Sequence, residues 1–199
     1  MGITQNIGAS SLIKPGVIDN TAARPASPYE GQMVYEKDTD MLAIWNGTAW
    51  RYIAATTATN GTVLQVVDAS YSTQTTTSSS TYADTGLSVT ITPKSTSSKI
   101  FISVAQQGIL KLGGTTESAC SLRLVRGSTT ILQWAGYLGY TGSTASNSES
   151  ASTVYLDSPS TISATTYKTT FATTTNGSGT IDCQRDGVTS TIVAMEIAG

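Results

Sequence analysis

The side chains that most often carry out catalysis are scarce in this sequence. Histidine is absent from its 199 residues, so neither a Ser–His nor a Cys–His nucleophile can form. A Ser–Lys pair or two carboxylates would be competent, but no motif pairs any acids, and Asp182 and Asp186 flank a predicted turn where we expect them to be solvated. Neither a phosphate-binding glycine loop nor a dinucleotide fingerprint is present. We therefore expect a protein that is not an enzyme and binds no cofactor.

Two groups of residues have the chemistry of metal ligands but not the spacing. Glu36, Asp38 and Asp40 alternate along the chain, yet they lack the glycine and the distal glutamate of a calcium loop, which favours a solvated turn. Cys120 and Cys183 are too few and too far apart for a zinc site. Each cysteine falls on the apolar face of a predicted strand, which favours two buried reduced thiols, while a bridge between neighbouring strands remains open. No metal site is predicted.

The amino-acid composition argues against a nucleic acid or a membrane as the partner of this chain. The net charge is −2, the pI is about 5.0 and only 12% of the residues are charged, so no basic patch is available for a nucleic acid backbone. The apolar runs are too short to span a bilayer, and the N-terminus lacks the basic and apolar regions of a secretion signal. We expect that the chain does not insert into a membrane and that it is assembled in the cytoplasm. The many Thr and Ser residues favour strands and turns over helices.

Residues 1–23 have no clear period and are predicted to form an extended N-terminal arm. Its apolar residues are dispersed among Gly, Ser, Asn and Pro: Ile3, Ile7, Leu12, Ile13, Val17 and Ile18. The arm is too apolar for a free tail and too irregular for a helix. Two interpretations are open: the arm packs on its own domain, or it orders on the surface of another protein.

Residues 24–54 are predicted to form a three-stranded β-meander. Its strands are Gln32–Glu36, Met41–Trp45 and Thr48–Ile53, and Asn46-Gly47 predicts a type I′ hairpin turn because both residues tolerate a positive φ. So small a sheet buries little, and its aromatic side chains need a further surface to pack on. These are Tyr35, Trp45, Trp50 and Tyr52. The meander therefore favours a docking or oligomeric role.

A linker over residues 55–61 leads into a predicted antiparallel β-sandwich over residues 62–199. Apolar residues alternate with polar ones in a series of short segments that are separated by turn residues, as in all-β sandwiches. The segments begin near Thr62, Leu87, Ile100, Cys120, Ile131, Tyr155, Thr165, Thr180 and Val193. We expect a long loop from Gly136 to Ser150. The fold class is all-β.

A strand, a corner and a second strand stand out between Tyr155 and Phe171. Asp157-Ser158-Pro159 ends the first strand, because proline donates no ladder hydrogen bond, and period-two alternation then resumes from Thr165. Tyr155, Tyr167 and Phe171 are the largest apolar side chains of this Thr-rich stretch. Either they pack in the core of the sandwich or they lie where subunits meet.

The segment from Arg24 to Asp40, followed by Trp45-Asn46-Gly47-Thr48-Ala49-Trp50, resembles a module common in virion proteins of tailed bacteriophages, especially small fibres and minor structural proteins. Further phrases typical of these proteins are Thr92–Ile100, Leu122–Ser128, Tyr155–Pro159 and Met195–Ile197. Together they cover most of the chain. The resemblance implies a virion location, a homotrimer, an N-terminal region that binds the particle, and a head like the TNF or C1q jelly roll.

Two functional hypotheses follow from the resemblance. In the first, the chain is a fibre: the apolar arm residues with Tyr35, Trp45 and Trp50 bind other virion proteins (tail, adaptor or capsid), and Tyr137 and Tyr140 contact a host-surface saccharide or protein. These two tyrosines would otherwise pack at a subunit boundary, and Tyr155, Tyr167 and Phe171 are the candidate trimer contacts. In the second, the chain is a capsid decoration or cement protein, or a head fibre, that stabilises the shell. A lectin-like module or an enzyme lacks support in the sequence.

Overall fold

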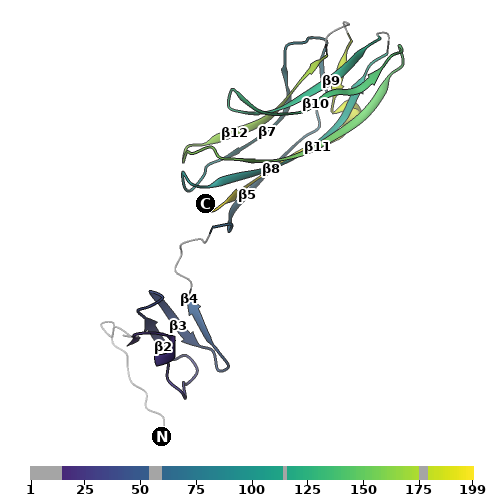
Figure 1. Ribbon diagram of the computed structural model, residues 1–199. Helices are drawn as coiled ribbons and strands as arrows, with labels where there is room; N and C mark the ends of the chain where they lie inside the picture. Colours follow the sequence, from purple (N-terminus) through teal and green to yellow (C-terminus); the bar gives the residue numbers. More distant parts are fainter. Residues whose placement is uncertain (1–14, 54–59, 114–115, 175–178) are drawn as a thin grey trace. The chain divides into compact units, whose positions relative to one another are not determined.

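Short alternating segments organise the chain into two β units (Figure 1), with a division near residue 57. The structure is a computed structural model and describes residues 15–53, 60–113, 116–174 and 179–199. Residues 55–59 of the predicted linker and the arm residues Ile3, Ile7, Leu12 and Ile13 lie outside the described residues. In the described part of the chain, no helix is long and apolar enough to cross a membrane.

The N-terminal unit is a four-stranded sheet in the order β1-β2-β3-β4. Its strands are β1 (Gly16–Ile18), β2 (Met33–Glu36), β3 (Met41–Trp45) and β4 (Trp50–Ile53). The predicted meander is confirmed as β2, β3 and β4, which pair antiparallel. β1 adds a parallel strand beside β2, and a 3-10 turn over Thr21–Ala23 follows it. The predicted arm therefore joins its own sheet from Gly16 onward.

The turn between β3 and β4 differs from the predicted type I′ turn. Trp45 pairs with Trp50, so the loop holds the four residues Asn46–Ala49, and only Gly47 has a positive φ, of 90°. The Oδ1 atom of Asn46 accepts the backbone N–H groups of Thr48 (3.1 Å) and Ala49 (2.8 Å). The Asn46 side chain thus accepts the free N–H groups of the loop and stabilises a four-residue loop in place of the two-residue turn.

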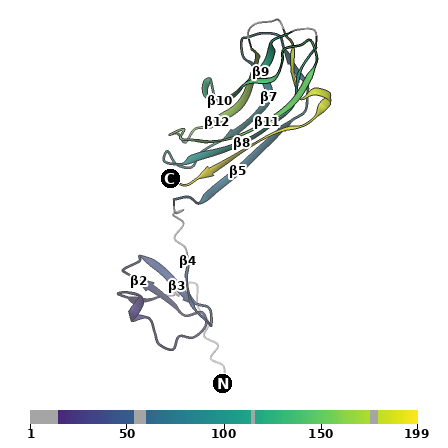
Figure 2. The ribbon, with the colours of Figure 1, turned by 45° about the vertical axis from the view of Figure 1, so that its right-hand side comes forward.

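The C-terminal unit is an antiparallel sandwich of two sheets, and the predicted fold class is confirmed. Its strands are β5 (Val63–Tyr71), β6 (Thr75–Thr77), β7 (Ala83–Ile91), β8 (Lys99–Lys111), β9 (Ser118–Arg126), β10 (Thr129–Thr141), β11 (Asn147–Asp157), β12 (Thr165–Thr173), β13 (Ile181–Cys183) and β14 (Ser190–Ile197). Sheet I has the order β5-β14-β8, which β11 extends over most of β8 and the short β13 and β6 extend at one end. Sheet II has the order β10-β9-β12-β7. Figures 1 and 2 show the two sheets as stacked layers, and the strand order is that of a jelly roll.

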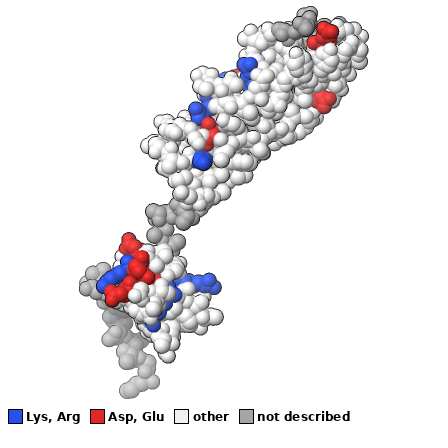
Figure 3. Space-filling view, in the orientation of Figure 1, with Lys and Arg blue, Asp and Glu red and all other residues white. Residues whose placement is uncertain are grey.

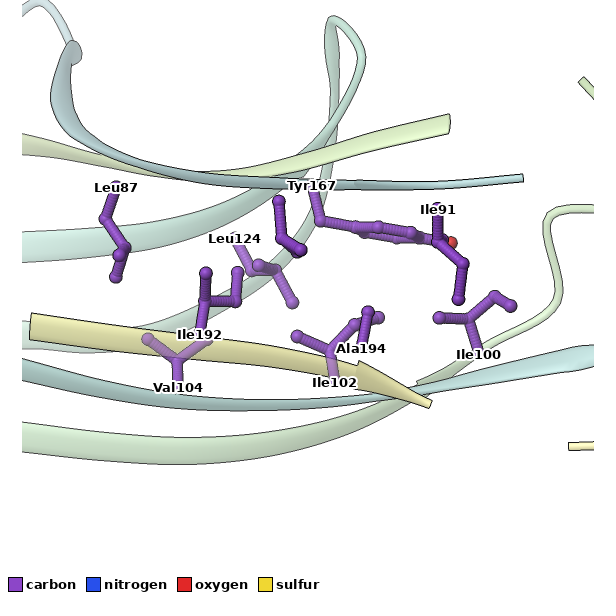
Figure 4. Close-up of a cluster of buried hydrophobic side chains, with 10 residues drawn as sticks. Leu87, Ile91, Ile100, Ile102, Val104, Leu124, Tyr167, Ile192 and Ala194 are labelled. Atoms are coloured by element: carbon purple, nitrogen blue, oxygen red, sulfur yellow. The ribbon is translucent and has the colours of Figure 1, made fainter. Parts of the chain in front are cut away.

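The core lies between these sheets, and side-chain alternation fills it from both sides. Leu87, Leu124 and Tyr167 project from sheet II toward Ile102 and Ile192 of sheet I (Figure 4). Each fully buried aliphatic side chain of this kind contributes roughly 2 kcal/mol. A second cluster fills the other end of the sandwich and consists of Ile109, Cys120, Leu122, Ala151, Phe171, Ile181 and Cys183.

The two cysteines are free thiols, both buried in this second cluster. A hydrogen bond with the Cys120 thiol and burial both raise the pKa of Cys183 above its usual range. The Cys183 thiol therefore remains protonated at neutral pH, and a protonated thiol is a poor nucleophile.

A polar layer separates the two clusters. Gln106 of β8 and Thr169 of β12 are fully buried, at the inward positions between members of the two clusters. Thr169 donates to Gln106 Oε1 across the sheets (3.0 Å), and Gln106 Nε2 donates to Ser190 Oγ (3.1 Å). Thr85 joins the layer through the Thr169 hydroxyl at 2.5 Å. Because these buried groups are hydrogen-bonded, the layer restricts how the two sheets can slide past each other.

The loop expected in this unit is wrong, whereas the expected corner is present. The predicted loop from Gly136 to Ser150 is mostly strand, since β10 continues to Thr141 and β11 begins at Asn147. Repeated register shifts interrupt the pairing of β10 with β9, and Gly139 has a φ of 72°, so no simple alternation marks this strand. The predicted corner does end β11 at Asp157, and the chain then crosses from β11 of sheet I to β12 of sheet II.

Candidate interaction surfaces

The corner after β11 holds the two sheets together through a buried carboxylate. Asp157 is 6% exposed and accepts two hydrogen bonds from Arg126 Nη1, at 2.9 and 2.8 Å. The Tyr167 hydroxyl donates to Asp157 Oδ2 at 2.7 Å. Arg126 and Tyr167 come from sheet II and Asp157 from sheet I, so this ion pair spans the sandwich. Burial and the bond to Asp157 raise the pKa of Tyr167, which stays a hydrogen-bond donor.

The three aromatic residues proposed as trimer contacts occupy two different environments. Tyr167 and Phe171 are 0% and 1% exposed within a single chain and belong to the two core clusters. Side chains enclosed to this degree present no surface to a second subunit, so these two are core residues. Tyr155 is half-buried and packs against the first cluster from β11. Tyr167 and Phe171 are therefore not available for contact with a second copy.

The outer face of sheet I carries such a surface, because apolar residues also occupy its outward positions. Val66, Met195, Phe101 and Leu156 are direct neighbours in the pairing of β5, β14, β8 and β11 and form one row across the sheet. Val66 is 54% exposed and Leu156 48%. Val193 and Val154 lie in the next row, on either side of Ser103. We call these six apolar residues the sheet I face.

An exposed apolar row of this kind is uncommon on a sheet that faces only water. One face of an antiparallel sheet normally packs on the core while the other carries polar residues. On β8 and β14, however, half-buried Phe101, Val193 and Met195 alternate with fully buried core residues. Contiguous apolar patches mark interaction sites. The sheet I face is therefore a candidate subunit interface.

The N-terminal sheet has a comparable open face. Val17, Tyr35, Leu42 and Ile53 are neighbours across its four strands. Val17 is 61% exposed and Ile53 48%, whereas Ile18 is half-buried on β1. Of the residues predicted to bind the virion, Tyr35 and Val17 thus lie in this open row. The Tyr35 hydroxyl donates to Asp40.

Trp45 and Trp50 lie on the opposite face of this sheet, which is covered. Their rings are 5.7 Å apart and tilted by 59°, and the Arg24 guanidinium stands 5.8 Å from the Trp50 ring. Both side chains are half-buried. These tryptophans therefore stabilise the sheet through a packed pair with a cation beside it.

A buried ion pair explains why this face is closed. Glu36 is fully buried and pairs with Arg24 Nε, while the Tyr52 hydroxyl donates to Glu36 Oε2 at 2.8 Å. The hydrogen bond from Arg24 lowers the pKa of Glu36 despite its burial. The prediction of a solvated turn is thus wrong for Glu36, although Asp38 and Asp40 are exposed. The sequence offered no periodic signal for this pair, because Arg24 lies outside any strand.

Asp182 also departs from its predicted solvation. It is 1% exposed, accepts from Arg185 Nη1 at 2.7 Å and accepts from the Thr76 hydroxyl at 2.7 Å, whereas Asp186 is exposed. Among the described residues, no group of three or more acids or cysteines lies close enough to hold a metal ion.

Tyr137 and Tyr140, the predicted host contacts, lie on β10 rather than on a loop. Tyr137 is 73% exposed and Tyr140 46%, and their rings meet edge to face with centroids 6.1 Å apart. The structure therefore brings the two tyrosines together on a strand at the edge of sheet II.

Comparisons with known proteins give a similarity in fold only. No protein-family model matches the sequence, and no curated protein matches it. Among solved structures, the fold is similar to VP2 of infectious bursal disease virus in its subviral particle, with a TM-score of 0.40 and 12% identity over 88% of this chain and 41% of VP2. T=1 particles derived from the same virus give a TM-score of 0.37 and 8% identity over 79% of this chain and 45% of that one. A mutant of VP2 gives a TM-score of 0.37 and 13% identity over 88% of this chain and 44% of that one. The chain spans less than half the length of these VP2 chains.

Proposed function

We propose that this protein is a structural component of a tailed-phage virion: a homotrimeric fibre whose N-terminal region binds another virion protein and whose jelly-roll head contacts the host surface. The observation that carries the proposal is the presence of an open apolar sheet face on each of the two units. One face serves assembly of the trimer and the other serves attachment to the particle. The assignment to a phage particle rests on the sequence segments that resemble phage fibre proteins.

The trimer interface in this proposal is the sheet I face. Val66 and Leu156, at the two ends of the apolar row, are each about half exposed in the single chain. Covering this row with another copy removes apolar surface from water without burying any charge of the row itself. The half-buried Tyr155 packs behind the same strand that supplies Leu156 and supports the interface from within.

Attachment to the particle uses the open row of the N-terminal sheet. Val17, Tyr35, Leu42 and Ile53 offer an apolar platform to a tail, adaptor or capsid protein. The apolar residues predicted in the arm before Gly16 would extend this contact along the partner. Trp45 and Trp50 support the platform from the closed side of the sheet.

A structural role rather than a catalytic one is supported by the partners of the buried acids. Glu36, Asp157 and Asp182 each pair with an arginine, through Arg24, Arg126 and Arg185. Glu196 is fully buried and accepts from Gln65 and from the backbone of Lys94. These carboxylates are held within the fold by ion pairs and hydrogen bonds.

A cryo-EM map of the particle that contains this chain tests the proposal. We expect a three-fold appendage with the N-terminal unit on the particle and the sandwich distal. Its absence from the particle, or a map with isolated single copies, would overturn the proposal. Light scattering of the purified protein should give about three times the chain mass of 20.7 kDa, and a monomer at micromolar concentration would remove the trimer.

The same two open faces also suit a capsid decoration or cement protein, which would bridge neighbouring subunits on the shell. Two experiments separate the alternatives. A fibre should block adsorption of phage to host cells when added in excess as purified protein. A cement protein should instead bind empty capsids and raise the temperature at which they open.

A further inference from the structure

We propose that a groove on the outer face of sheet II binds a neutral saccharide. The groove has a volume of about 340 Å³ and lies over β9, β10 and the end of β12. Tyr82, Ser121, Gln133, Tyr137 and Thr173 line it, and none of the described residues that line it is charged. Its volume falls at the lower end of the range of small-molecule sites, with room for about one or two sugar rings.

The polar groups of the groove form a matched donor and acceptor. Arg123 Nε donates to Gln133 Oε1 at 3.0 Å, which orients the amide and leaves the Gln133 Nε2 group without a protein partner among the described residues. The Tyr82 hydroxyl and Ser121 Oγ are 2.5 Å apart, and Ser121 Oγ donates to the Ala135 carbonyl at 3.0 Å. The Tyr82 hydroxyl therefore donates to Ser121, and its own lone pairs accept no hydrogen bond from the described residues. A sugar hydroxyl, which both donates and accepts, suits this pair of groups.

An aromatic platform stands beside these polar groups. Tyr137 lines the groove and is 73% exposed, and the edge-to-face contact with Tyr140 restricts the orientation of its ring. The face of an aromatic ring carries partial negative charge and attracts the slightly positive C–H groups on one face of a pyranose. A restricted ring also loses little conformational freedom when a ligand binds.

Charge and apolarity argue against other ligands. The cations near the groove are already engaged: Arg123 stands 3.6 Å from the Tyr82 ring centre, and Lys168 pairs with Asp84 at 2.8 Å. No free cation is left among the described neighbours to hold a phosphate or sulfate. Among the described residues of the lining, Ala172 is the only aliphatic one, which is too little for a lipid or an apolar peptide. Neutral polyhydroxyl compounds remain as the chemical class that suits both the polar pair and the ring.

The inference rests on the proposed function for its biological meaning, because a host-surface saccharide is what a fibre head would contact. Its chemistry depends only on the groove. If the particle map shows no fibre, the purified chain should still bind sugar, because the groove belongs to the single chain. Conversely, a groove that binds no sugar leaves the trimeric fibre standing.

The test is saturation-transfer difference NMR on the full chain with methyl glycosides of glucose, galactose, mannose, rhamnose and N-acetylglucosamine. We expect at least one to bind with a millimolar or lower Kd, and with transfer strongest to C–H groups on one face of its ring. Tyr137→Ala and Gln133→Ala should each weaken binding at least tenfold, whereas Tyr137→Phe should keep it within about threefold, because the ring remains. Tyr29→Ala is the matched control, since Tyr29 is 70% exposed but lies in the N-terminal unit.

Three results would overturn the proposal. One is the absence of binding by all five glycosides at millimolar concentration. Another is equal loss of binding in the Tyr29→Ala control. The third is tighter binding of glucose 6-sulfate than of the neutral sugar, which would assign the groove to an anion. Near-UV circular dichroism of each variant separates loss of the groove from loss of the fold.

Discussion

The two outer faces of the sandwich differ although both sheets pack on the same core. Sheet II covers its outer face with its own polar contacts: Arg123 over Tyr82, Lys168 with Asp84, and Thr90 with Thr166. The sheet I face instead presents an apolar row that ends in Val66 and Leu156. Most of the sandwich surface in Figure 3 is uncharged, with charged side chains in small groups. In the proposed trimer, another copy therefore covers the sheet I face, whereas sheet II pairs many of its outward side chains within the single chain.

Adding positive charge to the sheet I face tests whether this face mediates self-association. The double variant Val66→Lys and Leu156→Lys should weaken self-association at least about 1,000-fold, because each ammonium would have to be buried unpaired on assembly. Light scattering should then give a single chain of 20.7 kDa, with near-UV circular dichroism unchanged.

The matched control places the same charges on sheet II, as Ser88→Lys and Thr130→Lys. Both positions are exposed on outer strands of that sheet. The control should keep the mass of the wild type. Equal dissociation of both variants would assign the interface to net charge rather than to the sheet I face.

A change at Tyr167 should lower the stability of the core without affecting assembly. Tyr167→Phe removes the hydroxyl that donates to Asp157 and should lower the free energy of unfolding by about 2 kcal/mol, as expected for a hydrogen bond to a charged group. That corresponds to a fall in Tm of roughly 4–8 °C for a chain of this size. The oligomeric mass at room temperature should not change. Dissociation of the folded variant would mean that Tyr167 acts at the interface after all.

The open row of the N-terminal sheet depends on Glu36, and this dependence is testable by pH. Because the pKa of Glu36 is lower in the folded chain than its ordinary value of 4.5, its stabilising contribution is complete above that value. The contribution is lost as the pH falls below 4.5 through the folded pKa. We expect the N-terminal sheet to open on acidification, which the fluorescence of Trp45 and Trp50 reports.

Two variants sharpen that measurement. Trp134→Phe removes the sandwich signal at small cost, since Trp134 Nε1 has no hydrogen-bond partner among the described residues. In this background Glu36→Gln should abolish the acid transition, because no carboxylate titrates at that position. An unchanged acid midpoint in the Glu36→Gln variant would assign the transition to another group.

Features of this fold that depend on neighbouring residues could be predicted from the sequence, whereas features that depend on contacts between distant segments could not. Alternation at Leu87, Val89 and Ile91 is local, so it correctly indicated both a strand and the core residues on it. The second half of β10 was missed because its bulges interrupt that alternation. The corner at Asp157 was recognised, but whether β11 and β12 share a sheet depends on long-range pairing that the corner does not encode.

The candidate surfaces show the same limit more strongly. Val66, Phe101, Leu156 and Met195 each look unremarkable in sequence, and only the register of four strands aligns them. The groove of sheet II similarly joins Tyr82, Ser121 and Tyr137 from three separate segments. Tyr137 alone was found in advance, because an aromatic residue among polar ones is visible without any knowledge of pairing.

The smallest effect is expected from the ion pair on the outer face of sheet II. Lys168 and Asp84 are 2.8 Å apart, but their side chains are 31% and 57% exposed, so water screens the attraction. Asp84→Asn should change the free energy of unfolding by no more than about 0.5 kcal/mol and should leave the oligomeric mass unchanged. Chemical denaturation and light scattering at low and moderate salt measure both quantities. A large loss of stability, or a change of mass, would mean that another copy also covers sheet II, and the contrast between the two faces would then disappear.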